Sequence, residues 1–163
     1  MRTLLILRHG QAAPEGAGQD HERPLTQHGA RSAERVGRVL QQKQLLPDRI
    51  ISSTALRARD TAQRVAVSAG FTSAIDELDA LYLAEAEAYI IAVRELAAAA
   101  QCVLIVGHNP GLEELALILT GERRSLPTAG LVVCALAITS FSELSLEVAG
   151  KMTFFSAPSE PSA

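Results

Sequence analysis

Three short polar clusters, each placed directly after an apolar run, carry the residue types that could do chemistry. They are Arg8-His9-Gly10, Ser52-Ser53-Thr54 with Arg57 shortly after it, and Gly107-His108-Asn109. Arginine suits the forked recognition of a phosphate or a carboxylate. Two imidazoles and at least two guanidinium groups are more than a solvated turn requires, so the clusters are candidates for a single anion-binding site.

The apolar runs before these clusters are the elements that must position them. Residues 4–7 form a run of apolar side chains, which is typical of a strand buried on both faces. In a parallel sheet the carboxyl ends of such strands share one edge, and ligands bind just beyond it. The imidazoles of His9 and His108 would then meet the guanidinium groups of the first two clusters. Gly10 lacks a Cβ, so the backbone can bend sharply there and a ligand can come close.

Strand and helix patterns alternate over the first three quarters of the chain, which predicts an α/β fold, a three-layer sandwich with a mostly parallel central sheet. Helices are expected from the N-cap Thr26 to a break at 47–48, and over 56–69, 85–100 and 112–119. Strands are expected over 3–7, 50–51, 73–78, 102–106, 131–138 and 144–148. The last two should be antiparallel, because too few residues separate them for a helical crossover.

The chain is expected to be a single domain. Its 163 residues suffice for one core, and no repeat or linker divides them. The domain is predicted over residues 1–155. Residues 156–163 are polar and proline-rich, which predicts a disordered tail.

Composition excludes several classes of protein. The net charge is −3, so there is no basic surplus to neutralise a nucleic-acid backbone. No apolar stretch is long enough to span a membrane, and no charged-then-apolar leader precedes the first strand. Cys102 and Cys134 lie in apolar runs, as reduced core cysteines do. We therefore expect a cytoplasmic protein that binds neither nucleic acid nor membrane.

The motifs resemble, in matching order, those of the histidine phosphatase superfamily, and the resemblance covers roughly residues 3–150. The matching residues are Arg8-His9-Gly10, Arg23-Pro24-Leu25-Thr26 with Gly29, Ser53-Thr54-Ala55-Leu56-Arg57-Ala58 with Thr61, and Gly107-His108. The short chain, the approach to Arg23 from Asp20 and the segment Leu-Tyr-Leu-Ala at 81–84 are most similar to the small SixA-like phosphohistidine phosphatases. The fold that this resemblance implies is phosphoglycerate mutase-like.

The resemblance also implies roles for residues of these clusters. His9 would be the nucleophile, which attacks phosphorus and forms a phosphohistidine intermediate that water then hydrolyses. Arg8, Arg57 and His108 would surround the phosphoryl oxygens, where catalysis depends mainly on positioning and fixed positive charge. Gly10 would belong to the same phosphate-binding site. His108 can donate a hydrogen bond, and it must be protonated to add charge.

Two interpretations of Arg23 stay open: it reaches the rim of the phosphate site, or it only pairs with Asp20. No metal and no cofactor is expected, since the arginines take over the electrostatic role of a metal. A metal site built from His9 and His108 is disfavoured, because the adjacent arginines would repel a dication. In addition, no carboxylate or cysteine falls at ligand spacing.

The substrate class depends on whether a general acid is present. An alkoxide leaving group needs a proton, whereas an imidazole, whose conjugate acid has a pKa of about 6.5, leaves without strong protonation. The acids after the third strand are Glu77, Asp79, Glu85 and Glu87, and none follows the pattern of the mutase-type members closely. Glu85 and Glu87 fit the first turn of a helix, where the helix dipole favours them. The acids within 15–22 stay open as candidates.

A missing acid and a short chain both favour phosphohistidine as the substrate, displayed on a partner protein such as a phosphotransfer domain. Two alternatives stay open. One is a phosphomonoesterase that acts on a small phosphorylated metabolite, and the other is a non-catalytic module that binds phospho-proteins without turnover. The intact His9 speaks against the second alternative.

Overall fold

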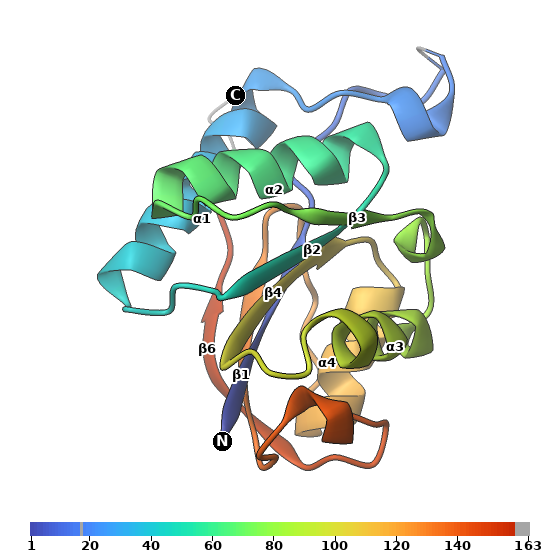
Figure 1. Ribbon diagram of the computed structural model, residues 1–163. Coiled ribbons are helices and arrows are strands. Elements are labelled where there is room, and N and C mark those ends of the chain that lie inside the picture. Colours follow the sequence, from blue (N-terminus) through green and yellow to red (C-terminus); the bar gives the residue numbers. More distant parts are fainter. Residues whose placement is uncertain (17, 159–163) are drawn as a thin grey trace.

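The computed structural model describes residues 1–16 and 18–158, and it places one sheet between two layers of helices (Figure 1). The strands are β1 (Arg2–Arg8), β2 (Arg49–Ser53), β3 (Asp76–Leu78), β4 (Cys102–Gly107), β5 (Leu131–Leu136) and β6 (Gly150–Ser156). The α-helices are α1 (Gln27–Gln42), α2 (Leu56–Ala69), α3 (Ala86–Leu96) and α4 (Gly111–Thr120). Short 3₁₀ turns, η1 (Asp20–Glu22), η2 (Asp79–Leu81) and η3 (Phe141–Glu143), lie in the connections.

The sheet has six strands in the order β3-β2-β4-β1-β5-β6. The first four strands of the chain are parallel to one another, with β4 between β1 and β2 and with β3 beside β2. Strand β5 is antiparallel to β1, and β6 is antiparallel to β5. The prediction of a mostly parallel sheet with antiparallel strands near the C-terminus is therefore confirmed.

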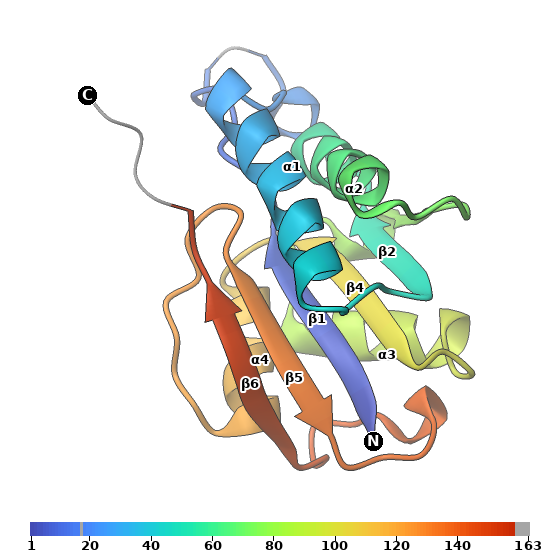
Figure 2. The ribbon, with the colours of Figure 1, turned by 90° about the vertical axis from the view of Figure 1, so that its left-hand side faces the viewer.

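Strand β1 shows why the sheet needs helices on both faces. Leu4 and Ile6 pack in one core with residues of α3 and α4, whereas Leu5 and Leu7 pack in the other with residues of α1 and α2. All four side chains are completely buried. Figure 2 shows α1 and α2 on one side of the sheet and α3 and α4 on the other. A strand covered on both faces has no polar side to display, which explains the unbroken apolar run in the sequence.

Helix α1 begins where the sequence predicts, because Thr26 caps it. The Thr26 backbone is extended, and its hydroxyl oxygen accepts a hydrogen bond from the Gly29 amide at 3.0 Å. The same hydroxyl donates to Oε1 of Gln11 at 2.8 Å. The cap therefore also ties the start of α1 to the loop that follows β1.

The C-terminal strands differ from the prediction. Strand β5 ends at Leu136, two residues before the expected end. The expected strand over 144–148 was wrong, since the last strand, β6, begins at Gly150. The alternation of apolar residues over 144–148 has another cause: Leu144 follows η3 and fills the core, while Leu146 is 38% exposed. A period of two in the sequence therefore also occurs in a loop without regular structure.

Helix α3 is shorter than its alanine-rich sequence predicts. It ends at Leu96 rather than at residue 100. The carbonyl of Ala98 accepts hydrogen bonds from the Phe141 amide at 3.1 Å and from the Ser140 hydroxyl at 2.9 Å. Tertiary partners thus satisfy this carbonyl where the chain leaves the helix. The strand expected over 73–78 is likewise reduced to the three residues of β3.

The C-terminal boundary also moves. Ser156 is the last residue of β6, so the tail predicted from that residue cannot begin there. The remainder of that prediction lies partly outside the described residues, which stop at 158. Both cysteines are free thiols; Cys134 is buried and Cys102 is half-buried. In the described part of the chain, no helix combines the length and the apolarity that a membrane span requires.

Replacing Thr26 by alanine should lower the free energy of unfolding by about 1 kcal/mol, because the first turn of α1 loses its side-chain acceptor. Urea titration measures this quantity. Thr26→Ser keeps the hydroxyl and is the matched control, which should stay within about 0.5 kcal/mol of the parent. Equal losses in the two variants would assign the effect to the methyl group instead of the cap.

Candidate functional site

The polar clusters converge at the carboxyl edge of the parallel strands. In the sheet register Arg8 lies beside Gly107, and Ser52 lies beside Val106, so the residues that follow leave the sheet next to one another. They line a pocket of about 580 Å³. The predicted residues that line it are Arg8, His9, Arg23, Arg57 and His108. The structure thus brings together residues that are far apart in the sequence.

His9 is held in a single orientation and a single tautomer. Its Nδ1 lies 2.7 Å from the carbonyl oxygen of Gly10, and a carbonyl can only accept, so Nδ1 carries the proton. Nε2 is therefore the unprotonated nitrogen, and the Nε–H of Arg57 donates to it at 3.4 Å. Burial, with smaller contributions from Arg57 and Arg8, lowers the pKa of His9 to about 4, although the bond to Gly10 acts in the opposite direction. The imidazole is neutral at pH 7.

Gly10 allows the sharp departure of the chain from β1. A Cβ on this residue would lie 2.7 Å from the carbonyl oxygen of Gly29 in α1, which is closer than backbone atoms tolerate. The Gly10 amide donates to the hydroxyl of Thr61 at 2.9 Å, and that hydroxyl donates to the Arg57 carbonyl at 2.7 Å. The turn that carries His9 is thus fixed to both α1 and α2. The contacts of Gly10 are structural.

Arg57 comes from the first turn of α2, and its side chain is only 3% exposed. Its Nη1 donates to the backbone carbonyl of Asp20 at 2.8 Å, and its Nη2 donates to Oδ2 of the same residue at 3.1 Å. Its Nε donates to His9, so the planar guanidinium group connects the loop at Asp20 with the imidazole. A buried guanidinium fixed at three nitrogens keeps its plane, as recognition of an oxyanion requires.

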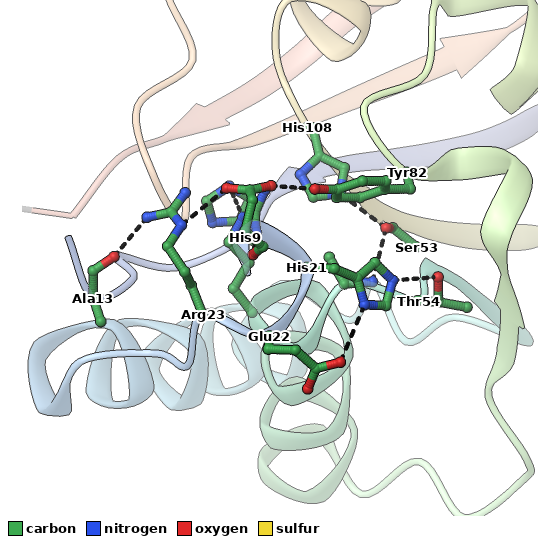
Figure 3. A network of polar contacts seen from close by, with 12 residues as sticks. His9, Ala13, His21, Glu22, Arg23, Ser53, Thr54, Tyr82 and His108 are labelled. Atoms are coloured by element: carbon green, nitrogen blue, oxygen red, sulfur yellow. Dashed lines mark hydrogen bonds and ion pairs between the residues drawn. The ribbon is translucent and has the colours of Figure 1, made fainter. Parts of the chain in front are cut away.

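Asp20 is the centre of the polar network. Its carboxylate accepts from Arg57, from Nε of Arg23 at 2.9 Å and from the hydroxyl of Tyr82. The hydrogen bond from Tyr82, together with those from the two arginines, lowers the pKa of Asp20 to about 2. Asp20 is therefore a permanent anion at neutral pH. Figure 3 shows Tyr82 and Arg23 around His9 in this network.

Arg23 pairs with Asp20 and also lines the pocket. Its Nε pairs with Asp20, and its Nη1 donates to the carbonyl of Ala13 at 2.5 Å. The same guanidinium group lines the pocket. Arg23 is therefore a rim residue whose position is set by the carboxylate.

His108 is buried at 2% exposure, and its ring centroid lies 5.3 Å from that of His9. Its amide donates to the hydroxyl of Tyr89 at 3.0 Å, and its Nε2 lies 2.8 Å from Oγ of Ser53. Burial, and then the neighbouring His9 and Arg57, lower the pKa of His108 to about 3. His108 is therefore neutral at pH 7 in the unliganded site, where it can donate a hydrogen bond without adding charge.

Arg8 reaches the pocket from the last residue of β1. Its Nη1 donates to the carbonyl of Leu126 at 3.3 Å, while its buried Nε has no hydrogen-bond partner in the described part of the chain. Glu113 accepts from the Leu126 amide at 2.8 Å and from Nδ2 of Asn109 at 3.0 Å, which holds this loop beside the guanidinium group. A donor of Arg8 is thus left over for a ligand.

The acids considered as proton donors are engaged elsewhere. Glu77 pairs with Arg59 at 3.4 Å, and Asp79 accepts from Thr54 at 2.6 Å. Glu85 and Glu87 stand at the start of α3, as their sequence position predicts. None of these four lines the pocket in the described structure, where the lining acids are Glu15 and Asp20.

Sequence reasoning missed two contributors to the site. Tyr82 belongs to the segment 81–84, which was noted only for its resemblance, and no local signal connects its hydroxyl to Asp20. The sequence pattern places Ser53 in a polar strand end and gives no indication of its bond to His108. A hydroxyl at the buried end of a strand is the signal that could have pointed to it.

Comparisons with known proteins identify relatives of this chain. A sequence model described as the histidine phosphatase superfamily (branch 1) matches residues 4–82, a range that contains His9 and Arg57. The uncharacterized protein Rv1276c of Mycobacterium tuberculosis is 32% identical over 143 residues, which cover 80% of this chain and 87% of that protein.

Solved structures share the fold over nearly the whole chain. A candidate phosphohistidine phosphatase SixA from Agrobacterium tumefaciens is 29% identical, with coverage of 96% of this chain and 98% of that one, and a TM-score of 0.81. The protein histidine phosphatase SixA in complex with tungstate is 23% identical, with coverage of 94% and 95% and a TM-score of 0.77. With its phosphoglycerate mutase-like fold and the matched motifs, the chain belongs to the histidine phosphatase superfamily.

Proposed function

We propose that this protein is a metal-independent phosphohistidine phosphatase. Nε2 of His9 attacks the phosphorus of a phosphohistidine on another protein, a new P–N bond forms, and the P–N bond to the substrate imidazole breaks. The released imidazole takes its proton from solvent. Water then attacks the phosphorus on His9, which regains its free Nε2 as inorganic phosphate leaves.

The observation that carries the proposal is the state of His9. A nucleophile needs an unprotonated lone pair, and the Nδ1–H bond to the Gly10 carbonyl leaves that lone pair on Nε2, where it meets only the long 3.4 Å contact from Nε of Arg57. The lowered pKa of His9, about 4, keeps the imidazole unprotonated over the physiological range. No separate base is needed to activate it.

The guanidinium groups suit the charge of the transferred group. A phosphoryl group in transfer spreads negative charge over three equatorial oxygens, and fixed donors stabilise that charge. Arg8, Arg23 and Arg57 all line the pocket, and Nε of Arg8 has no partner among the described residues. The neutral His108 adds a further donor. Arginines held by backbone carbonyls and by Asp20 need little rearrangement when the substrate binds.

The ionisation of Asp20 favours an imidazole over an alkoxide as the leaving group. A carboxyl group with a pKa of about 2 is ionised at pH 7 and has no proton to give to an alkoxide. An imidazole leaving group does not require one, since its conjugate acid has a pKa of about 6.5. Leu83, which is 56% exposed on the pocket lining, offers an apolar surface for such a ring. The similarity to proteins solved as SixA supports the same substrate class.

Glu15 supports the second candidate, a phosphomonoesterase for a small phosphorylated metabolite. It is the other acid on the pocket lining, and in contrast to Asp20 no arginine pairs with it in the described structure. A protonated Glu15 could serve an alkoxide leaving group. The two candidates therefore differ in the leaving group that the enzyme handles well.

A covalent phosphoryl group on His9 is the first expected outcome. The protein is mixed with ³²P-labelled phosphohistidine substrate and quenched at alkaline pH, where phosphohistidine survives. Label should remain on the parent protein and be absent from His9→Ala, whose turnover should fall by roughly a thousandfold or more. Binding of the phosphorylated partner without label and without turnover would favour a non-catalytic binding module.

Leaving-group dependence separates the two enzymatic candidates. The parent should hydrolyse phosphohistidine and p-nitrophenyl phosphate at least about a hundredfold faster than an alkyl phosphate such as glycerol phosphate, because no acid protonates the alkoxide. Glu15→Gln should change none of these rates by more than about twofold. Efficient hydrolysis of the alkyl ester that Glu15→Gln abolishes would identify the metabolite phosphatase instead.

Neutral buried imidazoles should make the fold sensitive to acid. The pKa of His9 is about 4 in the folded protein and about 6.5 when unfolded, so the unfolded state binds the extra proton between these values. Stability is fully present above that window and falls, as the pH drops through it, by up to about 1.4 kcal/mol per pH unit for each such histidine. His108 extends the loss toward pH 3, whereas the depressed pKa of Asp20 matters only below about pH 4.

Urea titrations between about pH 7.5 and about pH 4 measure this dependence. The parent should lose clearly more stability over the range than the double variant His9→Gln/His108→Gln. The same loss in both proteins would contradict the assignment of neutral imidazoles.

A further inference from the structure

We propose that Ser53 is a positioning residue that sets the tautomer of His108, so that Nδ1–H of His108 is aimed at the phosphoryl oxygens. This deepens the proposed function and rests on it. The residue is fully buried at the end of β2, and its hydroxyl lies 2.8 Å from Nε2 of His108. Figure 3 shows the dashed contact between Ser53 and His108, beside His9 and Tyr82.

The hydrogen bonds of Ser53 determine the direction of this contact. Its hydroxyl oxygen already accepts from the amide of Ala55 at 3.2 Å. Its one proton has no acceptor other than Nε2 of His108 among the described residues. The reverse direction would leave two buried groups unpaired, the O–H of Ser53 and the lone pair on Nδ1 of His108, whereas this direction leaves only Nδ1–H unpaired. The hydroxyl therefore donates, and Nε2 of His108 accepts.

A neutral imidazole that accepts at one nitrogen carries its proton at the other. In His108 that other nitrogen is Nδ1, which is buried and has no hydrogen-bond partner in the described structure. The ring lines the pocket beside His9. A buried N–H without a partner is unfavourable until a ligand supplies an acceptor, and a phosphoryl oxygen is such an acceptor.

The tautomer decides the sign of the interaction with substrate. With the proton on Nδ1, His108 presents a donor to an oxygen that gains negative charge during phosphoryl transfer. With the proton on Nε2 instead, Nδ1 would present a lone pair and would repel that oxygen. A doubly protonated ring would donate from both nitrogens, and the tautomer would then not matter. Burial beside Arg57 and His9 keeps the ring neutral, so the tautomer does matter. A single hydroxyl thus controls whether His108 assists or opposes the reaction.

Ser52 provides a matched control. It is the preceding residue of β2 and is equally buried, but its hydroxyl donates to the carbonyl of Ser53 at 2.9 Å and does not contact His108. Ser53→Ala and Ser52→Ala therefore remove the same group from adjacent buried positions. Ser53→Thr restores the hydroxyl and tests for rescue.

The experiment combines turnover with a direct readout of the tautomer. Ring nitrogens of His108 are observed by ¹⁵N NMR at pH 7, assigned with His108→Gln, in the free protein and with tungstate as the oxyanion probe. The parent should show a protonated Nδ1 and an unprotonated Nε2, and tungstate should shift Nδ1. In Ser53→Ala the two tautomers should be mixed, and kcat on phosphohistidine should fall roughly ten- to a hundredfold at nearly unchanged KM. Ser52→Ala should keep both properties, and Ser53→Thr should recover at least half of the activity.

Two results would overturn the assignment: an Nε2–H tautomer of His108 in the parent, or a Ser53→Ala protein that matches Ser52→Ala in both tautomer and turnover. The tautomer is measured in the parent protein, so the proposal can be refuted even if Ser53→Ala does not fold. If the parent fails to turn over phosphohistidine, the proposed function fails. In that case the tautomer, and a roughly tenfold weaker tungstate affinity of Ser53→Ala, still decide the role of Ser53.

Discussion

An excess of buried positive charge around one carboxylate is the constraint on which this site depends. Arg23 and Arg57 both bind Asp20, while Arg8 comes from the end of β1 and its Nε has no partner among the described residues. Because this charge is only partly compensated, a further cation in the pocket is unfavourable. Burial is the main reason that both imidazoles stay neutral, and the neighbouring positive charge adds to it, so their pKa values lie far below the ordinary value for histidine. An incoming phosphoryl group supplies the missing negative charge.

The same constraint links binding to chemistry. The charge that suits an oxyanion also helps burial to keep His9 unprotonated, so the proposed phosphate binding and the proposed nucleophilic role depend in part on the same arginines. Asp20 limits the excess charge and, through its backbone carbonyl and carboxylate, holds the plane of Arg57. Its ionisation, stabilised by Tyr82, removes it from proton transfer. Asp20 thus positions arginines, which is a different role from the protonation of a leaving group.

Rigid elements carry these groups. Arg8 ends a strand, Arg57 stands in the first turn of a helix, and the chain between Arg8 and Gly10 is fixed to α1 and α2 by close backbone approach and by Thr61. Such placement limits the rearrangement needed when a substrate binds, which is where much of the advantage of electrostatic catalysis comes from. The loop with Asp20 and Arg23 is tied to this frame through Arg57 and Ala13.

The sequence by itself determined the layers, the order of most elements and the meeting of His9, Arg57 and His108. These follow from local signals, namely apolar runs, a helix cap at Thr26 and the rule that parallel strands share a carboxyl edge. Only the tertiary structure decided the protonation states and the partners. Tyr82 and Asp20 are 62 residues apart, and no pattern predicts their bond. Burial keeps His108 neutral, and no local segment of the sequence reports that burial. The alternating pattern over 144–148 predicted the last strand too early. The start of that strand depends on how the preceding loop packs.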